Sequence, residues 1–526
     1  MPYPRNMRDT VVTLRNGRLE GLIEDRQLVL RGLPYAAPPI GALRWRAPEP
    51  HGGWHGLRPA TRFGATASQN PPLVPMTRRL LGAGGSSGED CLTLNVWTPR
   101  PDGQRRPVLF WIHGGAFVIG SGSTPLYEGR RLARSGNVVV VTINYRLGAL
   151  GFLCHPSLRD HRDGIVPNLG LRDQIAALEW VRDNIADLGG DPENVTIFGE
   201  SAGAMSIGCL LGAPPARGLF RRAILQSGAA SNVSDGPDAA RITEVILHEL
   251  GLGPDVSPER LRALPLESIL EAQRKTAFKL GFQLGLLPFQ PCVDGDVLPA
   301  PPLELLARSG TDGGPPAEIM LGTNRDEWRL FLLGDRALSR LDESAFRSRL
   351  EQVLGLVPGA DRAGLLARAL DTYGPELGSV TQRWCAFQAD RVFHAPAVLL
   401  ADRLAAAGSA VRLYRFDWSP PLVGGWTGAF HGIEIPFVFG TVRDGFLGAT
   451  LGWQPEVRQL ARRMRRAWLE FARHGDPTHE RLPDWPHWSS ASHPGVVLGP
   501  SGGPALGLPS PTAAFFESLL GMAQAA

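Results

Sequence analysis

Short apolar runs rich in β-branched and aromatic residues recur along the chain, separated by segments with helical periodicity. Runs of this length and composition are typical of buried β-strands. We place strands at 108–113, 138–143, 195–198, 223–226, 318–321 and 411–416, and a helix at 171–188. Because strands that alternate with helices form parallel sheets, the sequence predicts an α/β fold with a mostly parallel central sheet flanked by helices.

Two long segments depart from this alternation. Residues 231–306 and 331–391 have helical periodicity and lack repeated strand-like runs. No repeat, low-complexity tract or long linker divides the chain into independent domains. We therefore expect a single domain over residues 1–526, in which the two segments are cap or lid insertions.

The clearest chemical signal is the pentapeptide Gly-Glu-Ser-Ala-Gly at residues 199–203. It follows the predicted strand 195–198 and precedes a stretch of small, helix-compatible residues. A serine flanked in this way at a strand-to-helix turn is typical of a nucleophile elbow, because the sharp turn leaves no room for side chains two positions either side. Ser201 is therefore the candidate nucleophile.

A second loop follows the predicted strand 108–113 and reads Gly114, Gly115, Ala116. Attack of a serine on a carbonyl group builds negative charge on the carbonyl oxygen, which backbone N–H groups can stabilise. Small residues allow the loop to approach closely, and the N–H of Ala202, the residue after the nucleophile, supplies the further donor expected in such sites. The loop therefore predicts an oxyanion hole. We expect His113, just before it, to be a structural hydrogen-bonding residue.

The base and the acid are expected downstream of Ser201, in the order serine, acid, histidine. Most of the later histidines lie in polar or helical surroundings, whereas His431 lies in a Gly-flanked apolar loop. Asp326 and Glu327 follow the predicted strand 318–321, at the end where open α/β sheets place their ligand-binding loops. Either carboxylate could orient the histidine, so the residues alone leave the acid open. An unperturbed histidine titrates at about 6.5, which predicts an acid limb of activity near that pH.

Several long motifs, in order along nearly the whole chain, resemble the type B carboxylesterases, the branch of the α/β-hydrolases that includes the cholinesterases. These motifs lie at residues 31–36, 38–45, 89–97, 198–204, 226–228, 322–327 and 471–477. The family's acid is glutamate, so the resemblance selects Glu327 over Asp326. It also implies that Gly114, Gly115, Ala116 and Ala202 form the oxyanion hole, and that Ser227 hydrogen-bonds the acid.

The resemblance further implies which side chains surround the substrate. The expected pocket residues are Phe117, Glu200, Leu287, Phe289, Trp328 and Phe430. Of these, Glu200 adjoins the nucleophile, where the carboxylate either lines the pocket with an electrostatic or water-positioning role or is purely structural. Cholinesterases hold the quaternary ammonium group of choline with a tryptophan in the loop that corresponds to residues 71–88, and this loop contains none. The choline esters are therefore not the expected substrates.

The expected activity is hydrolysis of short- to medium-chain carboxylic esters by a serine carboxylesterase, through an acyl-enzyme intermediate, with water as co-substrate and no cofactor or metal. Two alternatives in the same class are a hydrolase of one specialised ester, carbamate or lactone, and a lipase. An alternative from a different class is the non-catalytic, cholinesterase-like binding module. Such modules have lost the catalytic serine, which is present here.

Composition narrows the setting of this chemistry. The formal net charge is only +3, and the arginine cluster at 462–466 lies in a stretch whose apolar residues recur every three or four positions. This pattern predicts an amphipathic helix with a solvated basic face and no nucleic-acid partner. The five cysteines have no metal-ligand spacing and predict buried free thiols in a reducing compartment. With no apolar run of signal-peptide or membrane-spanning length, we expect a cytoplasmic monomer or weak homo-oligomer without membrane attachment.

Overall fold

A computed structural model describes most of the chain. The described residues are 10–71, 86–99, 101–159, 164–280, 287–308, 318–332, 341–355, 361–421, 425–444, 448, 454–482, 484–499, 503–505, 515–516 and 519.

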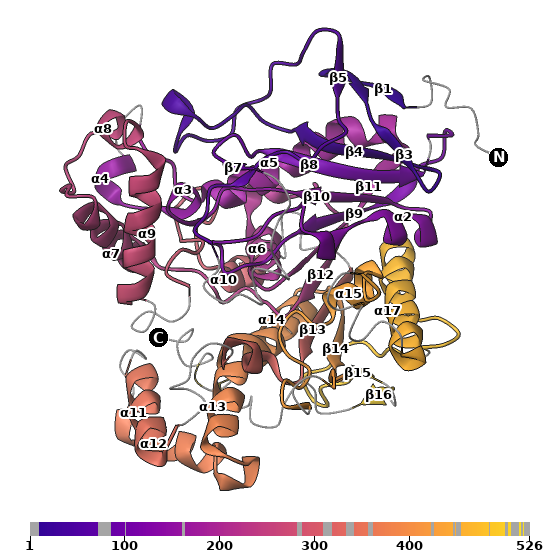
Figure 1. Ribbon diagram of the computed structural model, residues 1–526. Helices are drawn as coiled ribbons and strands as arrows, with labels where there is room; N and C mark the ends of the chain where they lie inside the picture. Colours follow the sequence, from indigo (N-terminus) through magenta and orange to yellow (C-terminus); the bar gives the residue numbers. More distant parts are fainter. Residues whose placement is uncertain are drawn as a thin grey trace.

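An 11-stranded sheet forms the centre of the molecule (Figure 1). Its strands lie in the order β16-β15-β14-β13-β12-β11-β9-β10-β8-β4-β3. The parallel part comprises β10 (Val139–Ile143), β9 (Arg106–Ile112), β11 (Gly190–Glu200), β12 (Arg222–Gln226), β13 (Glu318–Asn324), β14 (Ala410–Phe416) and β15 (Gly495–Leu498). The antiparallel strands at the two edges are β3 (Leu22–Glu24), β4 (Gln27–Pro34), β8 (Thr93–Pro99) and β16 (Pro504–Ala505). The predicted α/β fold with a mostly parallel sheet is confirmed.

All six predicted strands are present, with changes at their ends. The strand expected at 195–198 extends over Gly190–Glu200 and that at 318–321 extends to Asn324. The helix expected at 171–188 is α5 (Leu169–Asn184), which continues into the 3-10 helix η4 (Ile185–Leu188). The edge strands β3, β4 and β8 were not among the predicted elements.

Alternate residues of the central strands pack in two separate cores. On β9, Val108 and Phe110 belong to one core and Leu109 and Trp111 to the other. The first core is covered by helices that include α5, α6 (Ala202–Gly212) and α14 (Ala395–Ala406), and the second by α2 (Arg130–Gly136), α15 (Ile435–Phe439) and α17 (Pro455–His474). A sheet covered on both faces accounts for the continuous apolar runs of its strands.

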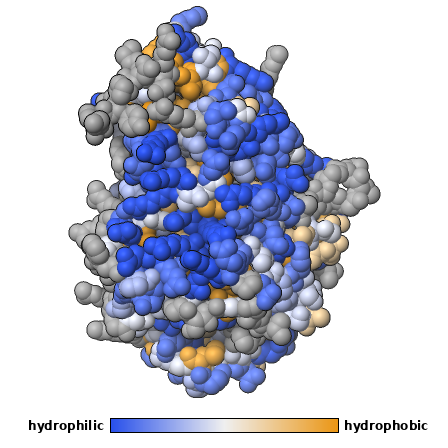
Figure 2. Space-filling view, turned by 90° about the vertical axis from the view of Figure 1, so that its right-hand side faces the viewer, coloured by the Kyte–Doolittle hydropathy of each residue, from blue (hydrophilic) through white to orange (hydrophobic). Residues whose placement is uncertain are grey.

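The amphipathic helix predicted around the arginine cluster is α17. Its apolar residues are buried in the second core. The face of the molecule that carries α17 is largely hydrophilic, with only small hydrophobic areas (Figure 2). Arg462 is exposed, whereas Arg463, Arg465 and Arg466 are half-buried, so the predicted basic face is only partly solvated.

The strand register brings the loops that carry the candidate catalytic residues together at the carboxyl ends of the parallel strands. Glu200 pairs with Gln226, which pairs with Gly322, and Gly199 pairs with Ile112. Because these strands are parallel, the chain segments that follow β9, β11, β12 and β13 all leave the sheet at the same edge. This edge carries the candidate nucleophile, the oxyanion loop and the acid.

The two segments expected to be insertions contain helices and no strand among their described residues. The first contains α7 (Gly236–Glu249), α8 (Pro258–Arg262), α9 (Leu266–Leu280) and α10 (Pro302–Arg308). The second contains α11 (Glu343–Leu354), α12 (Arg362–Thr372) and α13 (Val380–Ala389). Residues 281–286, 333–340 and 356–360 of these segments lie outside the described residues. That the two helical segments form a lid stays a prediction.

Two further expectations concern membranes and thiols. Across the described ranges, no helix combines the length and apolar character needed to cross a bilayer. All five cysteines are free and buried, as expected.

A buried ion pair joins the loop after β10 to α5. The carboxylate of Asp173 accepts hydrogen bonds from Nη2, Nε and the backbone N–H of Arg146 at 2.6, 2.8 and 2.9 Å. The Asp173 side chain is 0% exposed and that of Arg146 is 5% exposed. Removal of one partner would leave the other charge buried without compensation.

We expect Asp173→Asn to lower the free energy of unfolding by about 3–5 kcal/mol, because the Arg146 cation then stays buried beside a neutral amide. The matched control is Asp183→Asn on the same helix, since the Asp183 side chain is 37% exposed in its pair with Arg182. That change should cost at most about 1 kcal/mol. Denaturant midpoints measure both, and equal shifts would contradict the assigned role of the buried pair.

Candidate active site

Ser201 lies at a strained turn between β11 and α6. Its backbone has φ 55° and ψ −126°, a combination that costs a non-glycine residue about 1–3 kcal/mol. The turn is held on both sides, because the Ser201 N–H donates to the carbonyl oxygen of Gln226 at 2.9 Å and the Ser201 carbonyl accepts from Met205 at 2.8 Å. The geometry expected of a nucleophile elbow is therefore present at Ser201.

The glycines of the pentapeptide are required by close backbone contacts. A Cβ atom on Gly203 would lie 2.0 Å from the carbonyl oxygen of Ile112, and one on Gly199 would lie 2.8 Å from the same oxygen. Ile112 is the last residue of β9, so the two glycines let the start of α6 and the end of β11 pack directly on β9.

The predicted oxyanion loop lies against Ser201. A Cβ atom on Gly114 would be 3.0 Å from the Cβ of Ser201 and 2.6 Å from the carbonyl oxygen of Glu200. The loop then turns through positive φ values at Gly115 and Ala116, of 115° and 55°. The N–H of Ala202 belongs to the first turn of α6, whose amides have no intrahelical acceptor. The oxyanion loop and the start of α6 thus both lie beside the serine.

His113 has the structural role expected of it. It is fully buried, stacks on Tyr145 with ring centroids 4.5 Å apart, and its Nδ1 lies 2.8 Å from the carbonyl oxygen of Gly114. Burial lowers the pKa of His113 to about 4, so the ring is neutral and Nδ1–H donates this hydrogen bond.

The structure brings Glu327 and His431 together. Glu327 begins the 3-10 helix η6 (Glu327–Leu332), three residues after the end of β13. Its Oε2 lies 2.7 Å from Nδ1 of His431, and its Oε1 accepts a hydrogen bond of 2.7 Å from the N–H of Asn324. Glu327 is 0% exposed and His431 is 7% exposed. A buried carboxylate in this position fixes the imidazole ring and its tautomer.

The other ring nitrogen of His431 faces Glu200. Its Nε2 lies 3.1 Å from Oε1 of Glu200 and makes no hydrogen bond to the Ser201 hydroxyl. Hydrogen bonds of this kind often tighten only when substrate is bound. The ring thus contacts the residue that directly precedes Ser201 in the chain.

Neighbouring carboxylates change the titration of His431. Burial alone would lower the pKa of His431, but the charge of Glu200 and the hydrogen bond and charge of Glu327 raise it to about 9. Burial raises the pKa of Glu200 to about 8, against the opposing effect of His431. The expectation of an unperturbed histidine near 6.5 is therefore wrong, because two buried carboxylates contact one ring.

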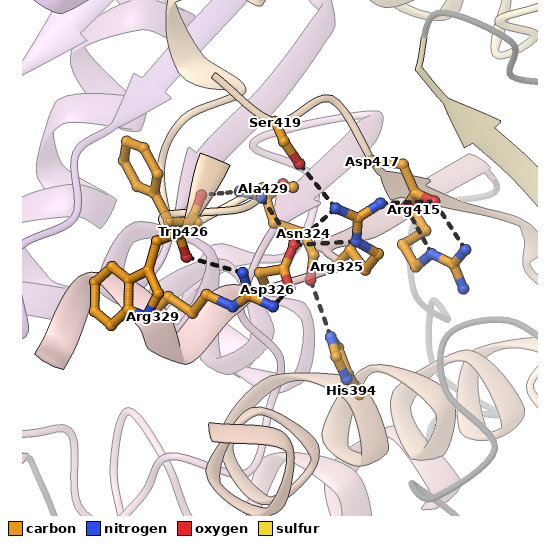
Figure 3. Close-up of polar contacts among 11 residues, drawn as sticks. Asn324, Arg325, Asp326, Arg329, His394, Arg415, Asp417, Ser419, Trp426 and Ala429 are labelled. Atoms are coloured by element: carbon orange, nitrogen blue, oxygen red, sulfur yellow. Dashed lines mark hydrogen bonds and ion pairs between the residues drawn. The ribbon is translucent and has the colours of Figure 1, made fainter. Parts of the chain in front are cut away.

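Asp326, the alternative acid, has a different environment (Figure 3). Its Oδ2 accepts from the N–H of Ala429 at 2.9 Å and from Nε of Arg325 at 3.0 Å, and its Oδ1 lies 2.8 Å from Nη2 of Arg329. These contacts attach the chain just before His431 to the turn after β13. Asp326 thus contacts the histidine loop but not the imidazole ring.

A buried polar network behind Glu327 was not predicted. The carboxylate of Glu434 accepts from Nδ2 of Asn324 at 2.6 Å and from Nε2 of Gln226 at 3.0 Å. Gln226 in turn accepts from the indole N–H of Trp468 at 3.0 Å. Burial raises the pKa of Glu434. The only sequence signal for Glu434 was its position, three residues after the candidate base His431.

The expected hydrogen bond from Ser227 to the acid is absent. Ser227 is buried at the end of β12 with φ 52°, but its hydroxyl has no hydrogen-bond partner in the structure. Each oxygen of Glu327 accepts one hydrogen bond from another residue, Oε1 from the N–H of Asn324 and Oε2 from Nδ1 of His431. This part of the prediction is wrong.

The predicted pocket residues differ in accessibility. Phe117 and Phe289 are both 0% exposed, Trp328 and Phe430 are nearly so, and Leu287 is half-buried. Phe331 and Phe393, which were not predicted, contact the His431 ring with centroids 5.4 and 4.7 Å away. The aromatic surroundings of the histidine thus come from η6 and from the helical segment after α13.

Known proteins are similar to this chain in both sequence and fold. The sequence profile described as the carboxylesterase family matches residues 8–501. The para-nitrobenzyl esterase of Bacillus subtilis (strain 168) is 37% identical over 492 residues, which cover 94% of this chain and 95% of that protein. The mouse cholinesterase is 33% identical over 528 residues, covering 95% and 85% of the two chains.

Solved structures give the same result. A carboxylesterase of Geobacillus stearothermophilus is similar with a TM-score of 0.83 and 39% identity, covering 96% of this chain and 99% of that chain. A structure of PNB esterase has a TM-score of 0.85 at 36% identity, with the same coverage.

We expect Glu200→Gln to lower the pKa of His431, because it removes the carboxylate that faces Nε2. An NMR titration of the His431 ring nitrogens measures this pKa. Glu179→Gln is the control, since Glu179 is exposed on α5 and its substitution changes the net charge equally. An unchanged pKa in Glu200→Gln, or an equal shift in the control, would contradict the account of the site's electrostatics.

Proposed function

The chain belongs to the carboxylesterase family and is a carboxylic ester hydrolase with the α/β-hydrolase fold, for which we propose that Ser201 is the nucleophile. In this proposal His431 is the general base and Glu327 is the acid that orients it. The observation that supports it most directly is the 2.7 Å contact between His431 and Glu327 beside the strained turn at Ser201.

The reaction proceeds in two similar steps. As Oγ of Ser201 attacks the ester carbonyl carbon, its proton passes to Nε2 of His431. The carbonyl oxygen becomes an oxyanion, which the N–H groups of Gly115, Ala116 and Ala202 stabilise. When the intermediate collapses, the bond to the alcohol breaks and the alcohol oxygen takes the proton from Nε2. An acyl-enzyme on Ser201 remains, and water then repeats the sequence and releases the acid.

The charges around His431 set the resting state of this mechanism. Only the neutral ring can accept the serine proton, so the reactive fraction grows as the pH rises through the pKa of about 9. Glu200 then lies 3.1 Å from the nitrogen that becomes protonated during the attack. We assign Glu200 the role of stabilising that cation.

Short- to medium-chain esters are the proposed substrates. The relatives include proteins named para-nitrobenzyl esterase, phenmedipham hydrolase and fumonisin B1 esterase, so related chains are named for different substrates. The aromatic rings of Phe331 and Phe393 against His431 support a small apolar site, because such rings limit the length of acyl chain that fits.

The cysteines bear on the cellular compartment of the enzyme. Five buried free thiols support a reducing compartment, and we propose a cytoplasmic monomer or weak homo-oligomer that needs only ester and water. We propose no nucleic-acid partner, no membrane attachment and no metal or other cofactor.

The assignment of the acid is tested by a pair of adjacent substitutions. Glu327→Gln should lower kcat by about four orders of magnitude, because the wrong tautomer of His431 is then favoured. Asp326→Asn should keep most of the activity, since Asp326 contacts the backbone of the histidine loop and two arginines. Ser201→Ala, measured alongside, gives the background rate. The reverse order of the two variants would move the acid to Asp326.

The acyl-chain preference is tested with aryl esters from acetate to palmitate. Each methylene buried in the pocket should stabilise the transition state by up to about 0.8 kcal/mol and raise kcat/KM accordingly, until the chain reaches the end of the pocket. We expect a maximum around butyrate to hexanoate, with palmitate esters, choline esters and emulsified triglycerides poor. A preference for long chains, or activation at an oil–water interface, would indicate a lipase instead.

A further inference from the structure

The helical segment that runs from α13 into α14 contains a π-helical turn beside the candidate site. This turn, η9 (Asp390–His394), lies between α13 and α14. Turns of this kind are rare and often occur at functional sites, because the extra residue redirects the side chains that follow. Here two consecutive residues reach the site. Phe393 packs on the His431 ring, and His394 contacts the end of β13 (Figure 3).

Both ring nitrogens of His394 face hydrogen-bond acceptors. Its Nε2 lies 3.0 Å from the carbonyl oxygen of Asn324, and its Nδ1 lies 2.8 Å from Oδ1 of Asp390. A carbonyl oxygen only accepts, so Nε2 carries a proton; an ionised Asp390 also only accepts, so Nδ1 carries one too. With Asp390 ionised, a ring bound in this way is an imidazolium ion.

The charged groups around His394 favour this state. Burial opposes it, but the hydrogen bond and charge of Asp390, the carbonyl of Asn324 and the charge of Glu327 together raise the pKa of His394. Asp390 is itself held, since its Oδ2 accepts from the hydroxyl of Tyr373 at 3.0 Å. His394 and Asp390 are 4% and 1% exposed, so solvent weakens these interactions little.

Asn324 connects His394 to the acid. Its N–H donates to Oε1 of Glu327 at 2.7 Å, its Nδ2 donates to Glu434 at 2.6 Å, and its carbonyl oxygen accepts from His394. The carbonyl and the N–H of one residue are therefore fixed at the same time. A change in the orientation of Asn324 would move the amide that holds Glu327.

We propose that His394, paired with Asp390, is a positioning residue that fixes Asn324 and through it the carboxylate of Glu327 beside His431. This inference rests on the proposed function, in which Glu327 orients the general base. His394 takes no part in proton transfer to the substrate. It acts by holding the acid within the small range of positions that the reaction tolerates.

Two substitutions of His394 separate positioning from packing. The amide nitrogen of glutamine reaches the place of Nε2 and can donate to Asn324, whereas that of asparagine reaches only the place of Nδ1. We expect His394→Asn to lower kcat by about 10- to 100-fold with KM little changed, because small displacements of a catalytic group have effects of this size. His394→Gln should recover most of the loss. Equal activity of the two variants, high or low, would overturn the proposal.

Further measurements keep the test decisive. Should His394→Asn fail to fold, Asp390→Asn removes the carboxylate that orients the ring, and it should lower kcat at unchanged KM; a wild-type kcat there would overturn the proposal. In the wild-type protein, NMR should show two ring N–H signals for His394 at neutral pH, and a single signal would contradict the imidazolium.

The proposal and the function on which it rests fail differently. If Glu327→Gln keeps full activity, the assignment of the acid is wrong. If Glu327→Gln and Ser201→Ala are inactive while His394→Asn matches the wild type, only the role of His394 is wrong.

Discussion

The backbones of β9, β11 and α6 meet at a point where no side chain fits, and the active site depends on this contact. Gly199 and Gly203 both lie against the carbonyl oxygen of Ile112, where added Cβ atoms would be 2.8 and 2.0 Å away. The chain can pass from β11 into α6 only through a sharp turn, and Ser201 takes the positive φ that this turn requires. The same packing presses Gly114 against Ser201. Backbone contact therefore places the candidate nucleophile and the oxyanion loop together.

A second constraint is the number of buried charges around that turn. Glu200, Glu327 and Glu434 are each at most 5% exposed, and unpaired burial of a carboxylate is costly. The donors to Glu327 and Glu434 come from the ends of different strands: Gln226 from β12 and Asn324 from β13. The electrostatics of the site thus depend on the strand register. A shift of β13 relative to β12 would separate the donors from the carboxylates they stabilise.

The parts of the site that sequence could predict are those determined locally. Ser201 and the oxyanion loop follow apolar runs and have small residues at fixed spacing, so both motifs and the strands before them were identified. Tertiary contacts decide the rest. Asp326 and Glu327 are adjacent carboxylates, and only the hydrogen bonds to Ala429 and His431 distinguish them; the family resemblance was needed to choose.

Helical surroundings led us to set His394 aside, because periodicity does not reveal a single π-helical turn. Likewise β8 escaped notice, since its buried Asn95 and Thr98 interrupt the apolar pattern. Every step of the proposed mechanism depends on Ser201 as the nucleophile. Treatment with an organophosphate followed by peptide mass spectrometry tests this assignment most directly. The account predicts one covalent adduct per chain, on the peptide that contains Ser201, together with complete loss of ester hydrolysis; inactivation with the adduct on another residue would contradict it.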